Sequence, residues 1–257
     1  LRLAVDLWRR GLTSAEGITG LAADGLLEFQ IQEGQIQGQL YARILEHIHD
    51  PEIRPLAFPG LVLRRLTPDL ILRVLARTCG VKVRDLDHAA DLLARLAEEQ
   101  ALVVLVDSGV LIHRSDVRRI MVHLLRQKEP ENAHKIEQAA VRYYARRASP
   151  AERAEEIYHR LTLNQRLSTV EKRWADAEQR GWISEMRPLL AGARDELEPR
   201  PRAWLAAKLD LELTPEESAE ADQQSWEHAV ARRARSGLEQ GRAAEALADM
   251  GQRPTWL

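Results

Sequence analysis

The chain has 257 residues, of which 45% are hydrophobic and 30% are charged, and its formal net charge is -2. This balance gives no overall positive field of the kind that attracts nucleic acid or anionic lipid. The single cysteine excludes an internal disulfide and a cysteine-based zinc cluster, which fits a reducing, cytoplasmic compartment. No apolar run approaches the roughly 20 residues that span a bilayer, so we expect no contact with a membrane.

Helical patterns dominate the sequence and predict a mostly α fold in three segments. The predicted boundaries are 1–58 for a short helical segment, 59–128 for a winged-helix domain and 129–257 for an irregular helical array. In the first segment, amphipathic spacing predicts helices over 1–10 and about 39–49, followed by a short helix that carries Ile53 and Leu56. Because the chain begins with Leu1 inside an apparent helix, we expect it to be a piece of a longer polypeptide.

The second segment opens with two predicted helices. Thr67 is a typical N-cap with Pro68 at the first helical position, and Cys79-Gly80 ends that helix. The next helix is expected to begin at Asp87. Its predicted apolar face consists of Ala90, Leu93, Ala94, Leu96 and Ala97.

A β-hairpin follows these helices. Two apolar runs, 102–106 and 110–112, flank Asp107-Ser108-Gly109, where glycine can adopt a positive φ. An amphipathic helix then begins near Ser115. The order helix, helix, hairpin, helix predicts a winged helix, a fold that binds DNA in some proteins and nucleotide or protein in others.

The third segment is predicted to form a series of helices that are separated by helix-breaking residues. The predicted helices are 131–147, 151–163, 168–180, 182–197, 201–211, 215–239 and 242–249. Residues 237–247 resemble a tetratricopeptide-type turn, so we expect an irregular TPR-like α-solenoid. Five of the six tryptophans lie in this half, where we expect them to fill the core between helices.

The search for catalytic patterns finds none. The sequence has no phosphate loop and no Gly-x-Gly-x-x-Gly pattern, and 102–107 resembles a Walker B strand only superficially. His47 and His49 point to different helix faces and have no third ligand. We therefore expect neither an enzyme activity, nor a metal site, nor a cofactor in this chain itself.

Binding to DNA is disfavoured by charge. Residues 84–99, the predicted recognition helix and its approach, carry two arginines against five carboxylates, a net of -3. A helix that enters the major groove lies against phosphates and normally has a basic excess. DNA is therefore an unlikely partner.

Three stretches resemble the region that follows the nucleotide-binding core in STAND-class signalling ATPases, the group related to NOD-like receptors, in their bacterial form. These stretches are Leu1-Arg2-Leu3-Ala4, Leu40–Leu45 through Pro59–Pro68, and Ile112-His113-Arg114-Ser115-Asp116-Val117-Arg118. The second is similar to the family's passage from the lid helices to the winged helix, so the resemblance implies that residues 1–58 are a helical, lid-like segment. The last is similar to the Met-His-Asp motif of the family's winged helix, although here two residues separate His113 from Asp116.

The resemblance implies a regulatory role. His113 would contact the nucleotide held by an upstream nucleotide-binding domain of the same polypeptide, which would bind ADP or ATP. The helical array would sense a protein partner or ligand, and nucleotide state would control homo-oligomerisation. In the other reading, His113 is simply a polar residue at the end of the wing strand, with Ser115 or Asp116 capping the next helix.

Three hypotheses follow. The first is a non-catalytic regulatory and sensor region of a STAND-type ATPase. The second is a winged-helix transcription regulator with a helical sensor domain, and the third is a helical scaffold that binds protein partners.

Overall fold

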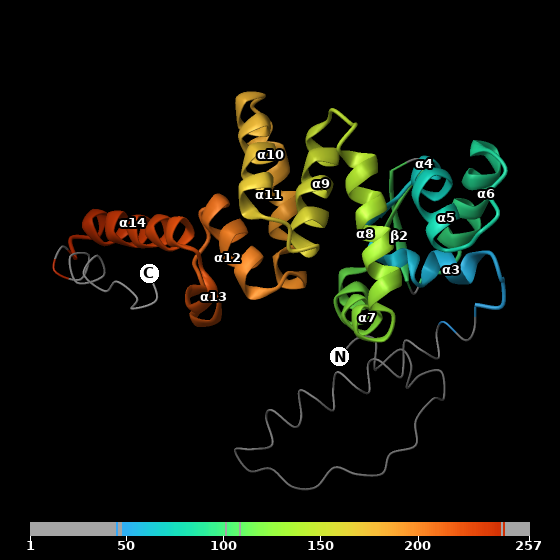
Figure 1. The fold of residues 1–257 in the computed structure, drawn as a ribbon, viewed down its shortest axis with the longest axis horizontal. Helices are drawn as coiled ribbons and strands as arrows, with labels where there is room; N and C mark the ends of the chain where they lie inside the picture. Colours follow the sequence, from blue (N-terminus) through green and yellow to red (C-terminus); the bar gives the residue numbers. More distant parts are fainter. Residues whose placement is uncertain (1–44, 46–47, 101, 108, 243, 245–257) are drawn as a thin grey trace, which may run out of the picture. The chain divides into compact units, whose positions relative to one another are not determined.

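A computed structural model describes residues 45, 48–100, 102–107, 109–242 and 244. The chain divides between Leu40 and Tyr41 into two units, and every described residue belongs to the second. The described part is mostly helical with one small sheet, as predicted (Figure 1). The predicted domain boundaries after residues 58 and 128 both fall within this second unit and stay predictions, and the predicted helices over 1–10 and 39–49 lie almost wholly outside the described residues.

The first part of the described chain alternates short helices with three strands. Its elements are α3 (Ile53–Ala57), the 3-10 turn η1 (Gly60–Val62), β1 (Arg65–Leu66), α4 (Pro68–Leu70), η2 (Ile71–Leu75), α5 (Ala76–Thr78), α6 (Leu86–Ala97), β2 (Val103–Asp107), β3 (Val110–His113) and α7 (Ser115–Lys128). The elements α4, η2 and α5 are continuous, with π-helical geometry at η2, and are called the α4–α5 helix below.

Local sequence sets the ends of the α4–α5 helix. The Thr67 hydroxyl accepts a hydrogen bond from the backbone N–H of Leu70 at 3.2 Å, and Pro68 occupies the first helical position. Gly80 follows the helix with a φ of 70°, a backbone conformation that favours glycine. The predicted start and end of this helix are therefore confirmed.

The prediction for α6 was wrong in its start and in its buried face. The helix begins at Leu86 because the Asp85 side chain accepts the N–H of His88 at 2.8 Å, so Asp85 rather than Asp87 is the N-cap. Ala90 and Ala94 are exposed. The buried face consists of Ala89, Leu92, Leu93 and Leu96, which have the regular i, i+3, i+4, i+7 spacing of one helix face.

The hairpin is confirmed, and it belongs to a three-stranded antiparallel sheet. Val103 pairs with His113 and Leu105 with Leu111, and Gly109 turns the chain with a φ of 79°. The sequence did not reveal β1, which pairs with β3 to give the order β1-β3-β2. The strand β3 is therefore central, and β2 forms an edge.

The second part of the described chain is a helical array. Its elements are α8 (Pro130–Tyr144), α9 (Pro150–Thr162), α10 (Leu167–Gln179), α11 (Ile183–Ala191), the 3-10 turn η3 (Arg194–Glu196), α12 (Pro199–Lys208), α13 (Pro215–Glu220) and α14 (Gln223–Glu239). Helix α9 packs against α8, α10 and α11, and α12 packs against α13 and α14.

Two predicted helices are divided in the structure. The helix predicted over 182–197 ends at Ala191 and is followed by η3. The helix predicted over 215–239 is interrupted because Asp222 accepts the N–H of Ser225 at 2.8 Å and starts α14 as a new N-cap. The helix predicted over 242–249 lies almost entirely outside the described residues.

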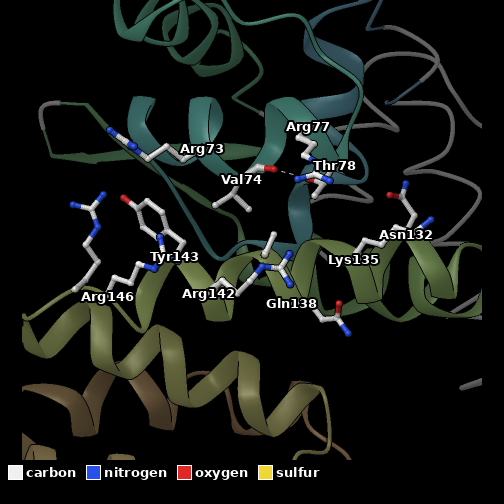
Figure 2. Close-up of a pocket in the computed structure, with 12 residues that line it drawn as sticks. Arg73, Val74, Arg77, Thr78, Asn132, Lys135, Gln138, Arg142, Tyr143 and Arg146 are labelled. Atoms are coloured by element: carbon white, nitrogen blue, oxygen red, sulfur yellow. Dashed lines mark hydrogen bonds between the residues drawn. The ribbon is translucent and has the colours of Figure 1, made fainter.

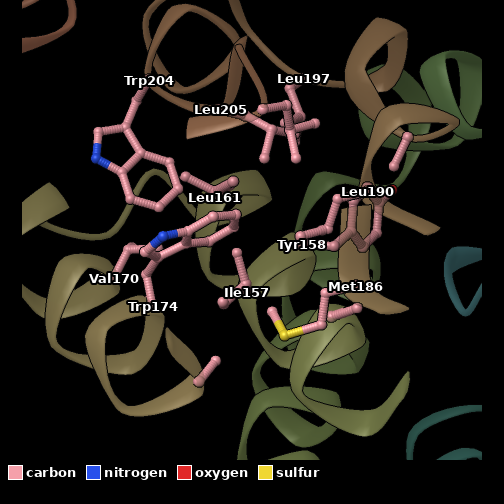
Figure 3. Packing of buried hydrophobic residues seen from close by; sticks show 14 residues of the cluster. Ile157, Tyr158, Leu161, Val170, Trp174, Met186, Leu190, Leu197, Trp204 and Leu205 are labelled. Atoms are coloured by element: carbon pink, nitrogen blue, oxygen red, sulfur yellow. The ribbon is translucent and has the colours of Figure 1, made fainter. Parts of the chain in front are cut away.

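Large side chains fill the centre of the array (Figure 3). The expectation that tryptophans fill this core is confirmed for Trp174 and Trp204, whereas Trp182 and Trp226 are partly exposed and Trp256 lies outside the described residues. Trp174 and Trp204 are both buried, and their rings meet edge to face with centroids 5.8 Å apart. Ile157, Leu161 and Val170 belong to the same cluster. Burying such large apolar surfaces is a main source of the stability of the array.

The positive φ at Gly80 gives a test of the fold. Gly80→Ala should destabilise the protein by about 1 kcal/mol, because left-handed backbone is costly for a residue with a Cβ even where no atom obstructs it. Gly192→Ala is the matched control, because Gly192 has a φ of -67° and space for a Cβ. Urea denaturation measures the free energy of unfolding of both variants. An equal loss of stability in the two would contradict the positive φ at Gly80.

Candidate functional site

The most unusual feature of the described chain is a buried cluster of charged side chains, where the first part meets the helical array. Three arginines, Arg64, Arg118 and Arg126, contribute from the first part. Four residues of the array pair with them directly: Glu137, Glu155, Tyr158 and Glu196. This cluster is called the buried junction below.

Arg118 lies at the centre of the buried junction. It projects from α7 and is 2% exposed. Its guanidinium binds both carboxylate oxygens of Glu196, with Nε–Oε1 at 3.1 Å and Nη2–Oε2 at 3.0 Å. It also donates to the backbone carbonyls of Leu61 and Val62 and to the Tyr158 hydroxyl at 2.8 Å. One side chain thus joins η1, α7, α9 and η3.

Arg64 forms a second connection. Its guanidinium makes a two-point contact with Glu155, at 3.1 and 2.8 Å, and donates to the carbonyl of Leu189 at 2.9 Å. Its charged carbon lies 4.5 Å from the centre of the Tyr158 ring, which is cation–π geometry. The segment before β1 is therefore attached to both α9 and α11.

Arg126 forms the third connection, from the last turn of α7. It donates to the backbone carbonyl of Glu196 at 3.0 Å and to Glu137 at 3.1 Å. Glu137 also contacts Nδ1 of the buried His159, so α8 and α9 share this carboxylate. Each of the three arginines thus pairs with a buried or nearly buried carboxylate of the array, although Nε of Arg126 has no hydrogen-bond partner among the described residues.

The junction charges stabilise one another in spite of burial. Burial by itself lowers the pKa of Arg118, but the Tyr158 oxygen that accepts its hydrogen bond and the carboxylates of Glu196 and Glu137 outweigh burial and raise that pKa. Burial by itself raises the pKa of Glu196, but Arg118 and the Tyr158 hydrogen bond hold it below the ordinary value. Burial raises the pKa of Tyr158 to about 12, so its hydroxyl stays protonated and donates to Glu196 at 2.6 Å.

His113, the predicted nucleotide contact, lies at the end of β3 with only 5% of its surface exposed. Its Nδ1 lies 3.1 Å from the carbonyl oxygen of Leu63, which requires Nδ1 to carry the proton. Burial, together with the positive charge of Arg118, lowers the pKa of His113 to about 3. The imidazole is therefore neutral, and its buried Nε2 has no hydrogen-bond partner among the described residues.

Neither of the predicted capping residues caps α7. The N-cap of that helix is Arg114, and no side chain makes a capping hydrogen bond there. Asp116 instead accepts from its neighbour Val117 at 3.0 Å and pairs with Arg114 at 3.0 Å. His113 thus lies at the end of the second hairpin strand, β3, while its contact with nucleotide stays a prediction.

Cys79 is a free cysteine and is partly buried. Burial raises the pKa of the Cys79 thiol to about 12, which keeps it protonated and poorly nucleophilic. Within the described ranges, no three His, Cys, Asp or Glu side chains are close enough to hold a metal ion. No described helix has the length and apolar character needed to cross a bilayer.

The buried junction was not predicted from the sequence, although the sequence of α7 contains one indication of it. Arg118 follows Val117 and precedes Met121 and Val122 on the face that faces the core, so a charge occupies a core position. Such a residue predicts a buried partner. Its partner could not be identified, because Glu196 is 78 residues away and many other carboxylates are candidates.

Comparisons of the chain with protein-family models, with curated proteins and with solved structures find no match.

Replacing Arg118 should strongly destabilise the fold. Arg118→Met leaves Glu196 buried without its cation, and breaking a buried pair in this way costs about 3–5 kcal/mol. The neighbouring exposed residue gives the matched control, Arg119→Met, which should have little effect. Adding Glu196→Leu to Arg118→Met should recover part of the loss, which a double-mutant cycle measures by denaturation. A loss no larger than that of Arg119→Met would contradict the importance of the junction.

The lowered pKa of His113 predicts that the fold loses stability as the pH falls. The pKa of His113 is lower in the folded chain than the ordinary 6.5, so the unfolded chain binds its proton first as the pH falls. Stability should therefore decrease below pH 6.5, by up to about 1.4 kcal/mol per pH unit. His113→Leu should reduce this slope between pH 6.5 and 5, whereas the exposed His123→Leu should not. If the free energy of unfolding of the wild type and of His113→Leu changed equally with pH, the lowered pKa of His113 in the folded chain would be contradicted.

Proposed function

We propose that this chain is the non-catalytic regulatory and sensor region of a bacterial-type STAND-class ATPase in the cytoplasm. In this proposal a nucleotide-binding core lies upstream in a longer polypeptide and binds ADP or ATP. The observation that carries the proposal is the buried junction, because paired buried charges join the sheet-containing part to the helical array. A change at one end would then be transmitted to the other.

The topology of the first part supports a winged helix. Helix α3, strand β1, the α4–α5 helix and α6 precede the hairpin β2–β3, and the strands have the order β1-β3-β2. This is the arrangement of parts expected of a winged helix: a helical core with a short strand between its helices and a hairpin as the wing. The family resemblance of residues 59–68 and 112–118 falls within this part.

The wing offers a surface for docking. Val104, Leu105 and Val106 on the edge strand β2 are 46%, 61% and 49% exposed. Three adjacent exposed apolar residues at a sheet edge are typical of a site that another protein surface covers. We assign this surface to contact with the upstream nucleotide-binding core.

The helical array supports a sensing role. Its successive helices pack on one another, as in TPR-like arrays whose exposed faces bind partners. A partner or ligand bound there would favour one docked arrangement of the winged helix, and nucleotide would favour one as well. Two ligands that bias the same equilibrium are coupled by thermodynamic necessity.

The structure does not favour the DNA-binding alternative. The position of a recognition helix is taken by α6, whose exposed side chains include Asp87 and Asp91, and the exposed Glu98 follows directly at its C-cap. Arg95, the one arginine within α6, is engaged by Asp50 and Glu52. The phosphates of a duplex would therefore face carboxylates on this helix.

The regulatory proposal predicts a nucleotide-dependent change of mass in the longer polypeptide. Light scattering should give a monomer with ADP and a defined oligomer with ATP, because nucleotide selects between two docked states. His113→Ala should raise the oligomer fraction with ADP by loosening the resting state, whereas His123→Ala should not. An unchanged mass with no retained nucleotide would refute the proposal and favour a helical scaffold.

A further inference from the structure

A basic groove lies between the α4–α5 helix and α8, away from the residues of the buried junction. Its volume is about 1070 Å³. Figure 2 shows Arg73 and Arg77 on the α4–α5 helix, with Lys135 and Arg142 on α8 on the other side of the groove. Two rows of cationic side chains thus face a shared space.

The groove has more positive than negative charge. Six cationic side chains line it: Arg73, Arg77, Lys135, Arg142, Arg146 and Arg147. Asp69 pairs with Arg73 and Arg147, and Glu131 lies 3.9 Å from Lys135.

The other three guanidiniums have no such compensation. Within the part of the chain that the structure describes, Arg77, Arg142 and Arg146 make no ion pair. All three are exposed. Like charges that line one groove repel one another, and an anionic ligand would relieve that repulsion.

We propose that this groove binds a compact ligand that carries several phosphate groups. Arginine presents a planar fork of donors that matches phosphate oxygens and binds them in pairs. Cations that converge from two helices suit a ligand with several charges close together. The cavity volume is also near the upper end of the range typical of small-molecule sites.

Nucleic acid fits this groove less well. A duplex needs an extended basic surface, whereas the chain has a net charge of -2 and α6 is acidic. A single strand usually needs aromatic rings for stacking. The tyrosine in the groove, Tyr143, is engaged by Asp69 at 2.6 Å and by Arg147, whose charged carbon lies 4.5 Å from its ring.

An acidic protein helix also fits less well. Helices that dock in grooves insert an apolar face. Among the described residues, the groove is lined by few apolar groups: Val74, which is itself buried, Ala139 and the ring of Tyr143. A ligand with several phosphate groups needs no apolar surface, because it can bind through the cationic side chains that line the groove.

A bound ligand of this kind would act on the fold as well. The α4–α5 helix belongs to the first part and α8 to the array, and the two are in contact. An anion that bridges Arg77 and Arg142 would hold these helices together. The site does not depend on the proposed nucleotide-binding core, so it can be tested with this chain alone.

Isothermal titration calorimetry of the 257-residue chain tests the proposal. The probes are inorganic tripolyphosphate, inositol hexakisphosphate and ATP. We expect one phosphate ligand per chain, with an affinity that falls as salt is added. Arg77→Gln with Arg142→Gln should weaken binding by at least about tenfold for each guanidinium removed. Lys82→Gln with Arg84→Gln removes the same charge elsewhere on the exposed surface and should leave binding unchanged.

The other outcomes are equally informative. Equal binding of ATP and tripolyphosphate would show that phosphate alone is recognised, whereas tighter binding of inositol hexakisphosphate would indicate a ring-borne cluster of phosphates. Absence of binding by all three probes, or an equal loss in the control variant, would overturn the proposal. So would groove-dependent binding of duplex DNA, single-stranded RNA or poly-glutamate that exceeds the binding of every phosphate probe. Circular dichroism confirms that each variant folds.

Discussion

The guanidinium of Arg118 binds three other pieces of the chain, η1, α9 and η3, and it is the most deeply buried of the three arginine connections between the two described parts. It caps the backbone carbonyls of Leu61 and Val62, pairs with Glu196 and binds the Tyr158 hydroxyl. A cation buried to this degree is tolerable only because each of its donors has a partner. The same requirement fixes where η1 and η3 lie, because either one displaced would leave a buried charge uncompensated.

The rest of the array follows the same design. Glu156 is fully buried and receives Arg153, Arg160 and Arg173 from its own helix and from α10. Glu217 is likewise buried and pairs with Arg194. Such pairs add less net stability than an apolar core of equal volume, but they select one geometry, since a misplaced helix would bury an unpaired charge. We infer that they set the relative positions of helices whose apolar faces are irregularly spaced.

The proposed regulatory role and the proposed phosphate site meet at the same boundary. The buried junction joins the sheet-containing part to α9 and η3, and the basic groove lies between the α4–α5 helix and α8 of the same two parts. A ligand in the groove would therefore strengthen a connection that the junction already makes. In a switching protein this would be a means of biasing one docked state, because the ligand binds that state better. The exposed residues of β2 would remain available for the upstream core.

The sequence by itself determined those elements whose signals are local. Thr67 and Gly80 set the ends of one helix, and Gly109 specified the hairpin, because capping and positive φ involve only neighbouring residues. The helical class followed from composition and spacing in the same way. Only the tertiary structure decided the two-residue strand β1, the pairing of Arg118 with Glu196 and the basic groove. Each of these joins residues distant in sequence, and no local propensity distinguishes the right partner from the many others of like chemistry.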